Sequence, residues 1–245
     1  MAELDPSPEV LQERLESVRE RVARAAARAA RSPEEIKIIA ISKTHPVALM
    51  QAALEAGVAH LGENRVQEAE AKINELGREA AQWHLVGHLQ TNKARRAVRL
   101  FDCIHSLDSA GLATRLERIC EEEQLERLPV LVQVDLAHEA TKSGITQDEL
   151  PLLVQALREC SRLRFVGLMT VPPFFDNPEE VRPYFGRLRG LRDELQSEGA
   201  FGDLPGELSM GMTHDFEVAV EEGATMVRIG TAIFGERANA PLAEA

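Results

Sequence analysis

The fold is indicated most clearly by the stretch Ile36-Lys37-Ile38-Ile39-Ala40-Ile41, which runs into Ser42-Lys43-Thr44-His45-Pro46. The first six residues are mostly β-branched and apolar, which favours a buried β-strand. A polar turn follows, and then an amphipathic helical pattern over Val47–Ala56. Parallel strands need a long crossover between them, usually a helix. This stretch therefore predicts one strand and helix unit of a parallel sheet.

The same unit recurs to the end of the chain. Eight strands are expected, at Ile36–Ile41, Val58–Gly62, Trp83–Gly87, Cys103–Leu107, Val130–Leu136, Phe165–Val171, Glu207–Met210 and Met226–Ile229. Helical patterns separate them, at Val47–Ala56, Val66–Leu76, Ala110–Glu123, Asp148–Cys160, Glu179–Glu198 and Phe216–Glu222. Eight such units in 245 residues predict a single (β/α)8 TIM barrel of the α/β class. A doubly wound open sheet is the alternative, because a strand count does not prove closure.

An additional amphipathic helix is expected over residues 8–31, before the first strand. Ser7 is a suitable N-cap and Pro8 suits the first helical position. One place for this helix is the bottom of the barrel. Because no Gly/Ser-rich or Pro-rich linker divides the chain, and about ten residues follow Gly235, we expect residues 1–245 to form one domain without a second.

Composition narrows the classes of partner. A net charge of −12 opposes binding to nucleic acid. One basic cluster is expected to be a solvated helix face: Lys93, Arg95, Arg96 and Arg99. No apolar run approaches the roughly 20 residues of a membrane span, and the N-terminus lacks the features of a signal peptide, so we expect a cytoplasmic protein. Three widely spaced cysteines are expected to stay reduced: Cys103, Cys120 and Cys160.

Polar and small residues follow the predicted strands, where a β/α barrel builds its active site. Ser209-Met210-Gly211-Met212-Thr213 comes after the seventh strand and Gly230-Thr231 after the eighth. Glycine lets backbone N–H groups approach an anion, and hydroxyls donate to it, so the two segments predict a phosphate site. Either segment alone is equally consistent with ordinary turn chemistry.

Lys43 ends an apolar strand and is a candidate Schiff-base lysine, because low-dielectric surroundings make the neutral amine accessible. A lone lysine at a strand end is more often solvated. Arg228 lies inside an apolar strand and needs a partner, either a cofactor or a carboxylate. His84 and His88 are four residues apart, but no third ligand has matching spacing, so we expect no zinc site.

The motifs together resemble the pyridoxal phosphate homeostasis proteins over almost the whole chain. They are Ile41-Ser42-Lys43-Thr44, Gly62-Glu63-Asn64, Trp83–Lys93, His105–Ser109, Lys142-Ser143-Gly144, Gly167–Thr170, Leu208–Met212 and Val227–Thr231. The resemblance implies a barrel like the N-terminal domain of alanine racemases, with pyridoxal 5′-phosphate held as an internal aldimine on Lys43. It also implies phosphate contacts from Ser209, Gly211, Gly230 and Thr231, with Asn64, Met210 and Arg228 lining the cofactor. Two positions depart from the pattern expected for this family, Thr213-His214 and Asp135. Thr213 keeps a hydroxyl, whereas the resemblance leaves the role of Asp135 open.

Two classes of function fit these residues: a cofactor carrier, and a pyridoxal-phosphate racemase, decarboxylase or aldolase. Catalysis needs an acid or base opposite the lysine. In the related two-domain enzymes a second domain supplies that group, and Tyr184, the one tyrosine here, falls in a predicted helix where packing is expected. We therefore expect a non-catalytic, monomeric protein that buffers pyridoxal phosphate for other enzymes. A phosphosugar aldolase is a third reading, and Lys142 and Lys93 are competing anchors.

Overall fold

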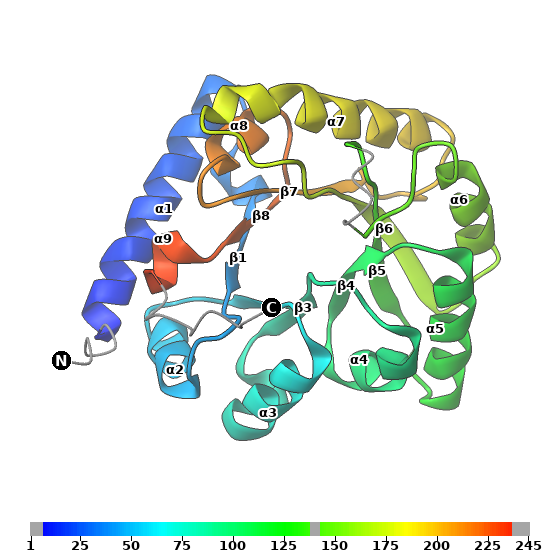
Figure 1. Ribbon diagram of the computed structural model, residues 1–245, viewed down its shortest axis with the longest axis horizontal. Helices are drawn as coiled ribbons and strands as arrows, with labels where there is room; N and C mark the ends of the chain where they lie inside the picture. The colour runs from blue at the N-terminus through cyan, green and yellow to red at the C-terminus, as the bar shows by residue number, and fades with distance from the viewer. Residues whose placement is uncertain (1–6, 138–142, 237–245) are drawn as a thin grey trace, which may run out of the picture.

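The predicted barrel is closed. The computed structural model describes residues 7–137 and 143–236. Its eight strands are parallel and follow one another in chain order, and β1 pairs with both β2 and β8 (Figure 1). This closure excludes the open-sheet alternative. The strands are β1 (Lys37–Ile41), β2 (His60–Glu63), β3 (Gln82–Leu85), β4 (Cys103–Leu107), β5 (Leu128–Gln133), β6 (Leu163–Met169), β7 (Glu207–Met212) and β8 (Met226–Ile229).

Helices surround the barrel in Figure 1. They are α1 (Pro8–Arg28), α2 (Val47–Glu55), α3 (Val66–Leu76), α4 (Ala94–Leu100), α5 (Ala110–Glu122), α6 (Leu150–Arg158), α7 (Arg182–Ser197), α8 (Phe216–Glu221) and α9 (Thr231–Phe234). Short 3₁₀ turns are η1 (Pro33–Glu35), η2 (Arg78–Ala80), η3 (Thr91–Lys93) and η4 (Pro178–Val181). The expected strands and helices are all present, with ends that differ by a few residues. The four-residue α9, directly after β8, was not expected.

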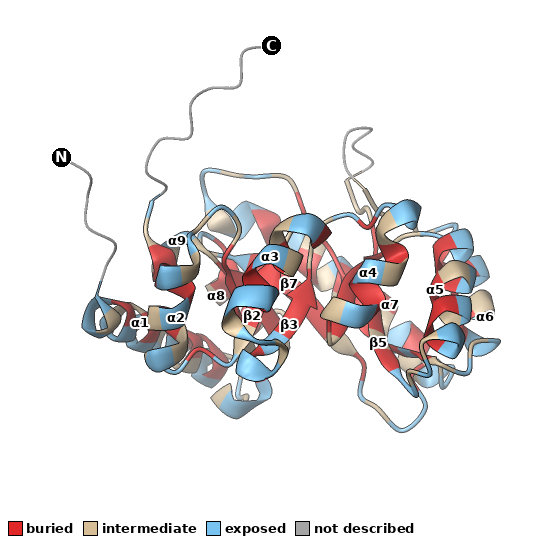
Figure 2. Ribbon diagram, turned by 90° about the horizontal axis from the view of Figure 1, so that it is seen from below, coloured by how far each residue is buried: buried red, intermediate tan, exposed pale blue. Residues whose placement is uncertain are grey.

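Apolar side chains form two layers. The larger layer lies between the strands and the helices and holds Trp83, Phe185 and Phe216. The smaller layer contains strand residues, among them Ile39, Ile41 and others of β4, β5, β6 and β8. Because side chains alternate between the two faces of a strand, this second group fills the barrel interior. Figure 2 shows the buried strands at the centre and the exposed outer faces of the helices.

The first helix lies on the side of the barrel rather than beneath it. It packs along α8, α9 and α2 (Figure 1) and buries Leu11, Leu15, Val18 and Val22. The bottom position considered from sequence is therefore wrong. The physical reason is the shortness of α9, because four residues leave the strands at the β8 and β1 junction uncovered. Ser7 does occupy the N-cap of α1, but its side chain makes no capping hydrogen bond.

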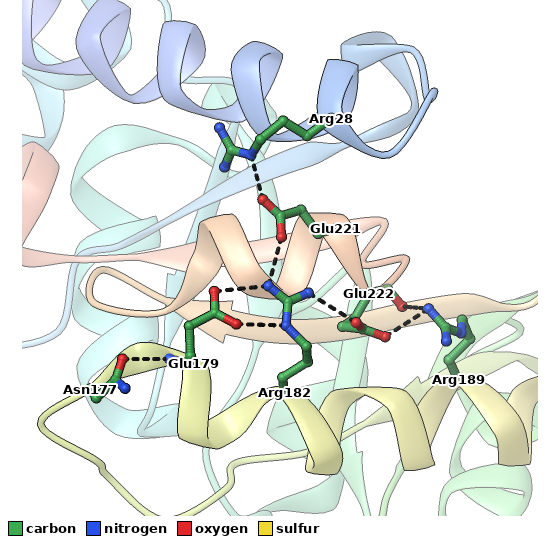
Figure 3. Close-up of polar contacts among 7 residues, drawn as sticks. All are labelled: Arg28, Asn177, Glu179, Arg182, Arg189, Glu221 and Glu222. Atoms are coloured by element: carbon green, nitrogen blue, oxygen red, sulfur yellow. Dashed lines mark hydrogen bonds and ion pairs between the residues drawn. The ribbon is translucent and has the colours of Figure 1, made fainter.

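Ion pairs join the outer helices. The Arg182 guanidinium contacts Glu179, Glu221 and Glu222, and Glu221 also accepts from Arg28 of α1 at 2.5 Å (Figure 3). These contacts link α7, α8 and α1 around the barrel.

The basic cluster is a helix face, as predicted. Arg95 and Arg99 of α4 pair with Glu123, and Arg96 pairs with Glu70 of α3. In residues 7–137 and 143–236 there is no helix that is both long enough and apolar enough to span a bilayer.

Candidate functional site

Lys43 lies on a turn that polar side chains hold on both sides. The lysine follows the end of β1 by two residues and is half-buried. Its neighbour Ser42 is fully buried, and the Ser42 hydroxyl donates to Glu63 Oε1 of β2 at 2.7 Å. On the other side, the Thr44 backbone N–H donates to Glu68 Oε1 of α3 at 2.5 Å, and Thr44 itself has φ 66°. The backbone on either side of Lys43 is therefore fixed by contacts to β2 and α3.

Lys72 adds a third group to these contacts, which together form a clamp on the lysine turn. Its ammonium donates to the Ser42 carbonyl at 2.8 Å and to the carboxylates of Glu63 and Glu68 at 2.7 Å each. Burial raises the pKa of Glu63, and the neighbouring Lys72 charge opposes that rise. Sequence reasoning missed Lys72, because a lysine in an amphipathic helix is normally solvated. An available signal was its spacing of four residues from Glu68, which places the two side chains on one helix face.

The loops after β7 and β8 meet the turn after β1. Gly230 lies against Ile41, since a Cβ there would be 3.7 Å from the Ile41 carbonyl oxygen. The His45 ring stacks on Phe234 of α9 with 5.0 Å between ring centres. The Thr213 hydroxyl accepts from the Ala232 backbone N–H at 3.4 Å and so joins the two loops. The lysine turn and the Gly230 and Thr231 segment therefore lie at the same end of the barrel.

Gly211 is required by this arrangement. Its φ of +88° is a conformation that side chains disfavour, and a Cβ would lie 2.5 Å from the Ala219 Cβ and 2.9 Å from the Phe216 Cα. The strand end can therefore press against α8. Thr231 is exposed and begins α9.

Ser209 lies deeper than the other residues predicted to bind phosphate. It is fully buried and pairs with Met226 at the start of β8, whereas Thr231 follows the end of β8. The Arg228 guanidinium donates to the Ser209 hydroxyl and to the Thr170 carbonyl, at 2.8 Å each. Ser209 is thus already engaged below the loops, and the hydroxyl that reaches the Gly230 segment is that of Thr213, directly after β7.

The sequence left open whether Arg228 meets a cofactor or pairs with a carboxylate. In the described residues its hydrogen bonds go to a hydroxyl and a carbonyl, not to a carboxylate. Burial lowers the pKa of Arg228 to about 10, so the group stays charged near neutral pH. Met210 is also fully buried, but its side chain packs in the layer between strands and helices. Any contact of Met210 with a cofactor stays a prediction.

The remaining candidates are spread around the barrel. Asn64 directly follows β2 and is half-buried, and Gly87 approaches it so closely that a Cβ would be 2.2 Å from the Asn64 carbonyl oxygen. Tyr184 packs against Phe175 from α7, which agrees with a packing role. Lys93 belongs to η3, and Lys142 lies outside the described residues. The Asp135 carboxylate accepts from the Ala137 backbone N–H at 3.0 Å.

His84 and His88, for which the sequence predicts no zinc site, make separate contacts. His88 is exposed and contacts Asp108 at 2.9 Å, whereas His84 faces His105 at 2.9 Å in the interior. One ligand atom each from His84, Cys103 and His105 lie within 4.8 Å of one another. The sequence did not reveal this cluster, because it depends on the register of β3 and β4, in which His84 pairs with Cys103. The absence of a zinc site stays a prediction.

Comparisons with known proteins agree with this architecture. The family model described as alanine racemase, N-terminal domain, matches residues 14–238. A pyridoxal phosphate homeostasis protein of Aquifex aeolicus is 44% identical over 225 residues, covering 92% of this chain and 97% of its own length. The protein of the same name from Escherichia coli K12 is 41% identical over 232 residues, with coverage of 91% and 95%.

Solved structures show the same relationship. PipY of Synechococcus elongatus PCC7942, solved with PLP bound, is 40% identical, with a TM-score of 0.77 over 92% of this chain and all of that one. Alanine racemase from Corynebacterium glutamicum shares the fold alone, with a TM-score of 0.64 and 14% identity. By its barrel, its motifs and these matches, the chain belongs to the pyridoxal phosphate homeostasis proteins, within the family of alanine racemase N-terminal domains.

Proposed function

We propose that this protein binds pyridoxal 5′-phosphate reversibly, attached covalently to Lys43, and buffers or carries it for enzymes that use it. The main support is geometric. A half-buried lysine stands on a clamped turn at the same barrel end as the Thr213 and Gly230 loops. The names of the relatives support the same reading.

The residues at this end fit a phosphorylated aldehyde. The hydroxyls of Thr213 and Thr231, with the small Gly230 beside them, suit a phosphate group because hydroxyls and backbone N–H groups donate to anions. The amine of Lys43 suits the aldehyde carbon, and the cofactor, once bound, supplies an electron sink. Arg228 carries a buried positive charge beneath the loops, where it is available to orient the ring.

We also propose that the chain turns over no amino acid efficiently. Catalysis on this cofactor needs a second acid or base opposite the lysine. Tyr184 is the chain's one tyrosine, and its ring packs against Phe175. As part of the same proposal, residues 1–245 form a single domain, and the protein acts in the cytoplasm as a monomer that passes its cofactor to apo-enzymes.

Borohydride reduction tests the anchor. Protein loaded with pyridoxal phosphate is reduced and digested, and the modified peptide is identified by mass spectrometry. We expect the adduct on Lys43, and we expect Lys43→Ala to remove it without loss of the fold, since the change removes no core volume. Lys93→Ala is the matched control and should label like the unmodified protein. An adduct on Lys93 or Lys142 would refute the assignment.

An activity assay tests the second part. Loaded protein is incubated with D- and L-amino acids, and racemised, decarboxylated and cleaved products are measured. Enzymes typically reach 1–10³ s⁻¹. Turnover in that range by the native chain, abolished in Lys43→Ala, would show that the protein is an enzyme rather than a carrier.

A further inference from the structure

Three histidines form a continuous chain of hydrogen bonds along the barrel interior. His105 Nδ1 lies 2.9 Å from the Ser209 hydroxyl, and its Nε2 lies 2.9 Å from His84 Nδ1. His84 Nε2 lies 3.1 Å from His60 Nδ1. Ser209 and His105 are fully buried, and His84 is 5% exposed. His60 is half-buried and lines a 310 Å³ pocket with Lys37 and Arg164 from the amino-terminal ends of β1 and β6.

Arg228 gives this chain a direction. A guanidinium donates hydrogen bonds and accepts none, so the Ser209 oxygen accepts from Arg228. Among the described residues His105 Nδ1 is the other partner of this hydroxyl, and it accepts the Ser209 hydrogen. A neutral imidazole carries one N–H, and burial lowers the pKa of His105 and His84, which keeps both neutral. His105 therefore donates from Nε2 to His84, and His84 donates from Nε2 to His60. The hydrogen of His60 is then on its Nε2.

These contacts also bear on the nearby thiol. His84, Cys103 and His105 are close enough together to bind a metal ion. However, all four ring nitrogens of the two histidines are engaged in the hydrogen bonds just described. Burial also raises the pKa of the Cys103 thiol, and the thiolate is the form that binds metals. We therefore interpret the cluster as a hydrogen-bonded chain.

We propose that this oriented chain, Ser209–His105–His84–His60, couples the site at Arg228 to the pocket at the opposite end of the barrel. A proton that reaches the Ser209 oxygen can pass along it. Ser209 gives its hydrogen to His105 Nδ1, His105 gives its Nε2 hydrogen to His84 Nδ1, and His84 gives its Nε2 hydrogen to His60 Nδ1. The incoming proton replaces the one that Ser209 lost. In the result His60 is an imidazolium and the other two rings stay neutral with reversed tautomers.

Coupling follows in both directions, because linkage is reciprocal. A charge on His60 requires a hydrogen on its Nδ1, and that hydrogen favours the reversed chain. In the reversed chain Ser209 accepts from both His105 and Arg228, so its hydroxyl hydrogen needs another acceptor, such as a bound ligand. The groups around His60 set its charge: Lys37 of β1, His84 of β3, Asp102 before β4, Arg164 of β6 and Glu207 of β7.

The tautomers are directly measurable by NMR of ¹⁵N-labelled full-length protein, through two-bond couplings between ring nitrogens and carbon-bound protons. Above about pH 8, where histidines are neutral, we expect His105, His84 and His60 all to carry hydrogen on Nε2. Below the pKa of His60, we expect the first two to move to Nδ1. If His105 or His84 carries its hydrogen on Nδ1 at high pH, or if neither changes when His60 titrates, the proposal is wrong. This measurement needs no variant and no cofactor.

Ser209→Ala adds a second test. It removes the hydrogen that orients the chain, so the His60 nitrogens, two rings away, should change from one tautomer to a mixture. His88 is the internal control, because it contacts Asp108 outside the chain. If Ser209→Ala disturbs His88 as well, the fold has changed, and Ser209→Thr, which keeps the hydroxyl, should then retain the original tautomers. An unchanged His60 in a folded Ser209→Ala protein overturns the proposal, whatever the fate of cofactor binding.

Discussion

Lys72→Met tests the clamp that holds the lysine turn. Lys72 is 5% exposed and neutralises Glu63, which is fully buried. Methionine keeps most of the side-chain volume but leaves Glu63 without its counter-charge. It also removes one of two donors to the Ser42 carbonyl, the other being the His45 backbone N–H. Removing one partner of a buried ion pair typically costs about 3–5 kcal/mol. We expect the free energy of unfolding to fall by about that amount near neutral pH.

The pH dependence of this loss has a definite sign. Burial raises the pKa of Glu63 even with Lys72 present, and without Lys72 the pKa rises further. A carboxyl whose pKa is higher in the folded than in the unfolded protein contributes stability below its ordinary pKa, and that contribution is lost as the pH rises through the folded value. The penalty of Lys72→Met should therefore grow as the pH rises through the raised pKa that Glu63 has in the native protein.

Urea denaturation at pH 5 and pH 8 measures both quantities. Lys37→Met is the matched control, because it removes an ammonium from a 2.7 Å pair with Glu207 whose side chains are 41% and 24% exposed. Such exposed pairs are worth about 0–1 kcal/mol. Equal losses in Lys72→Met and Lys37→Met, or a loss in Lys72→Met that is the same at both pH values, would refute the buried-pair reasoning.

Three further outcomes follow from packing and charge. Gly167→Ala should destabilise the protein by about 3 kcal/mol in chemical denaturation, because its Cβ would lie 2.0 Å from the Glu207 carbonyl oxygen. Gly190→Ala in α7, with no atom within 4 Å of its Cβ, should stabilise it by about 0.5–1 kcal/mol. A similar effect of both substitutions would contradict this. Arg182→Met leaves three carboxylates without their shared cation and should cost about 1–2 kcal/mol, with the difference shrinking at high salt. Native Cys103 should resist a thiol reagent until the protein is denatured, since burial raises its pKa, and rapid labelling of the folded chain would refute that.

The sequence predicted the elements whose signals are local. The strands are short runs that are mostly apolar or β-branched, and polar residues follow them, so the strand count, the lysine turn and the Gly230 loop could be predicted. The strand count favoured a closed barrel over an open sheet without proving it. The placement of α1 could not be predicted, because it depends on α9 being too short to cover the barrel beside β8 and β1. Lys72 was missed for a similar reason, since its partner Glu63 belongs to a different element.

The depth of a residue along its strand was the other quantity that the sequence could not provide. Ser209 and Thr213 both belong to one small-residue motif, yet Ser209 pairs with the start of β8 and Thr213 reaches the loop beyond its end. Strand pairing in this region contains a register irregularity between Ser209 and Met212, and such a shift leaves no mark in composition. Motif membership therefore indicates the strand, while register decides how deep in the barrel each hydroxyl lies.

The hydrogen-bonded chain Ser209–His105–His84–His60 inside the barrel satisfies polar groups that would otherwise be costly to bury. A buried polar group without a partner costs about 1–3 kcal/mol, so interior histidines are tolerated only when each ring both donates and accepts. Three neutral rings in series satisfy that condition in either direction, and the group at one end selects the direction. Arg228 only donates, which leaves the Ser209 hydrogen for His105. The hydrogen bonds of each member of this chain consequently depend on the others, from Arg228 and Ser209 to His105 and His84. Apolar residues usually fill a barrel interior, and they can replace the whole chain more readily than they can replace one member of it.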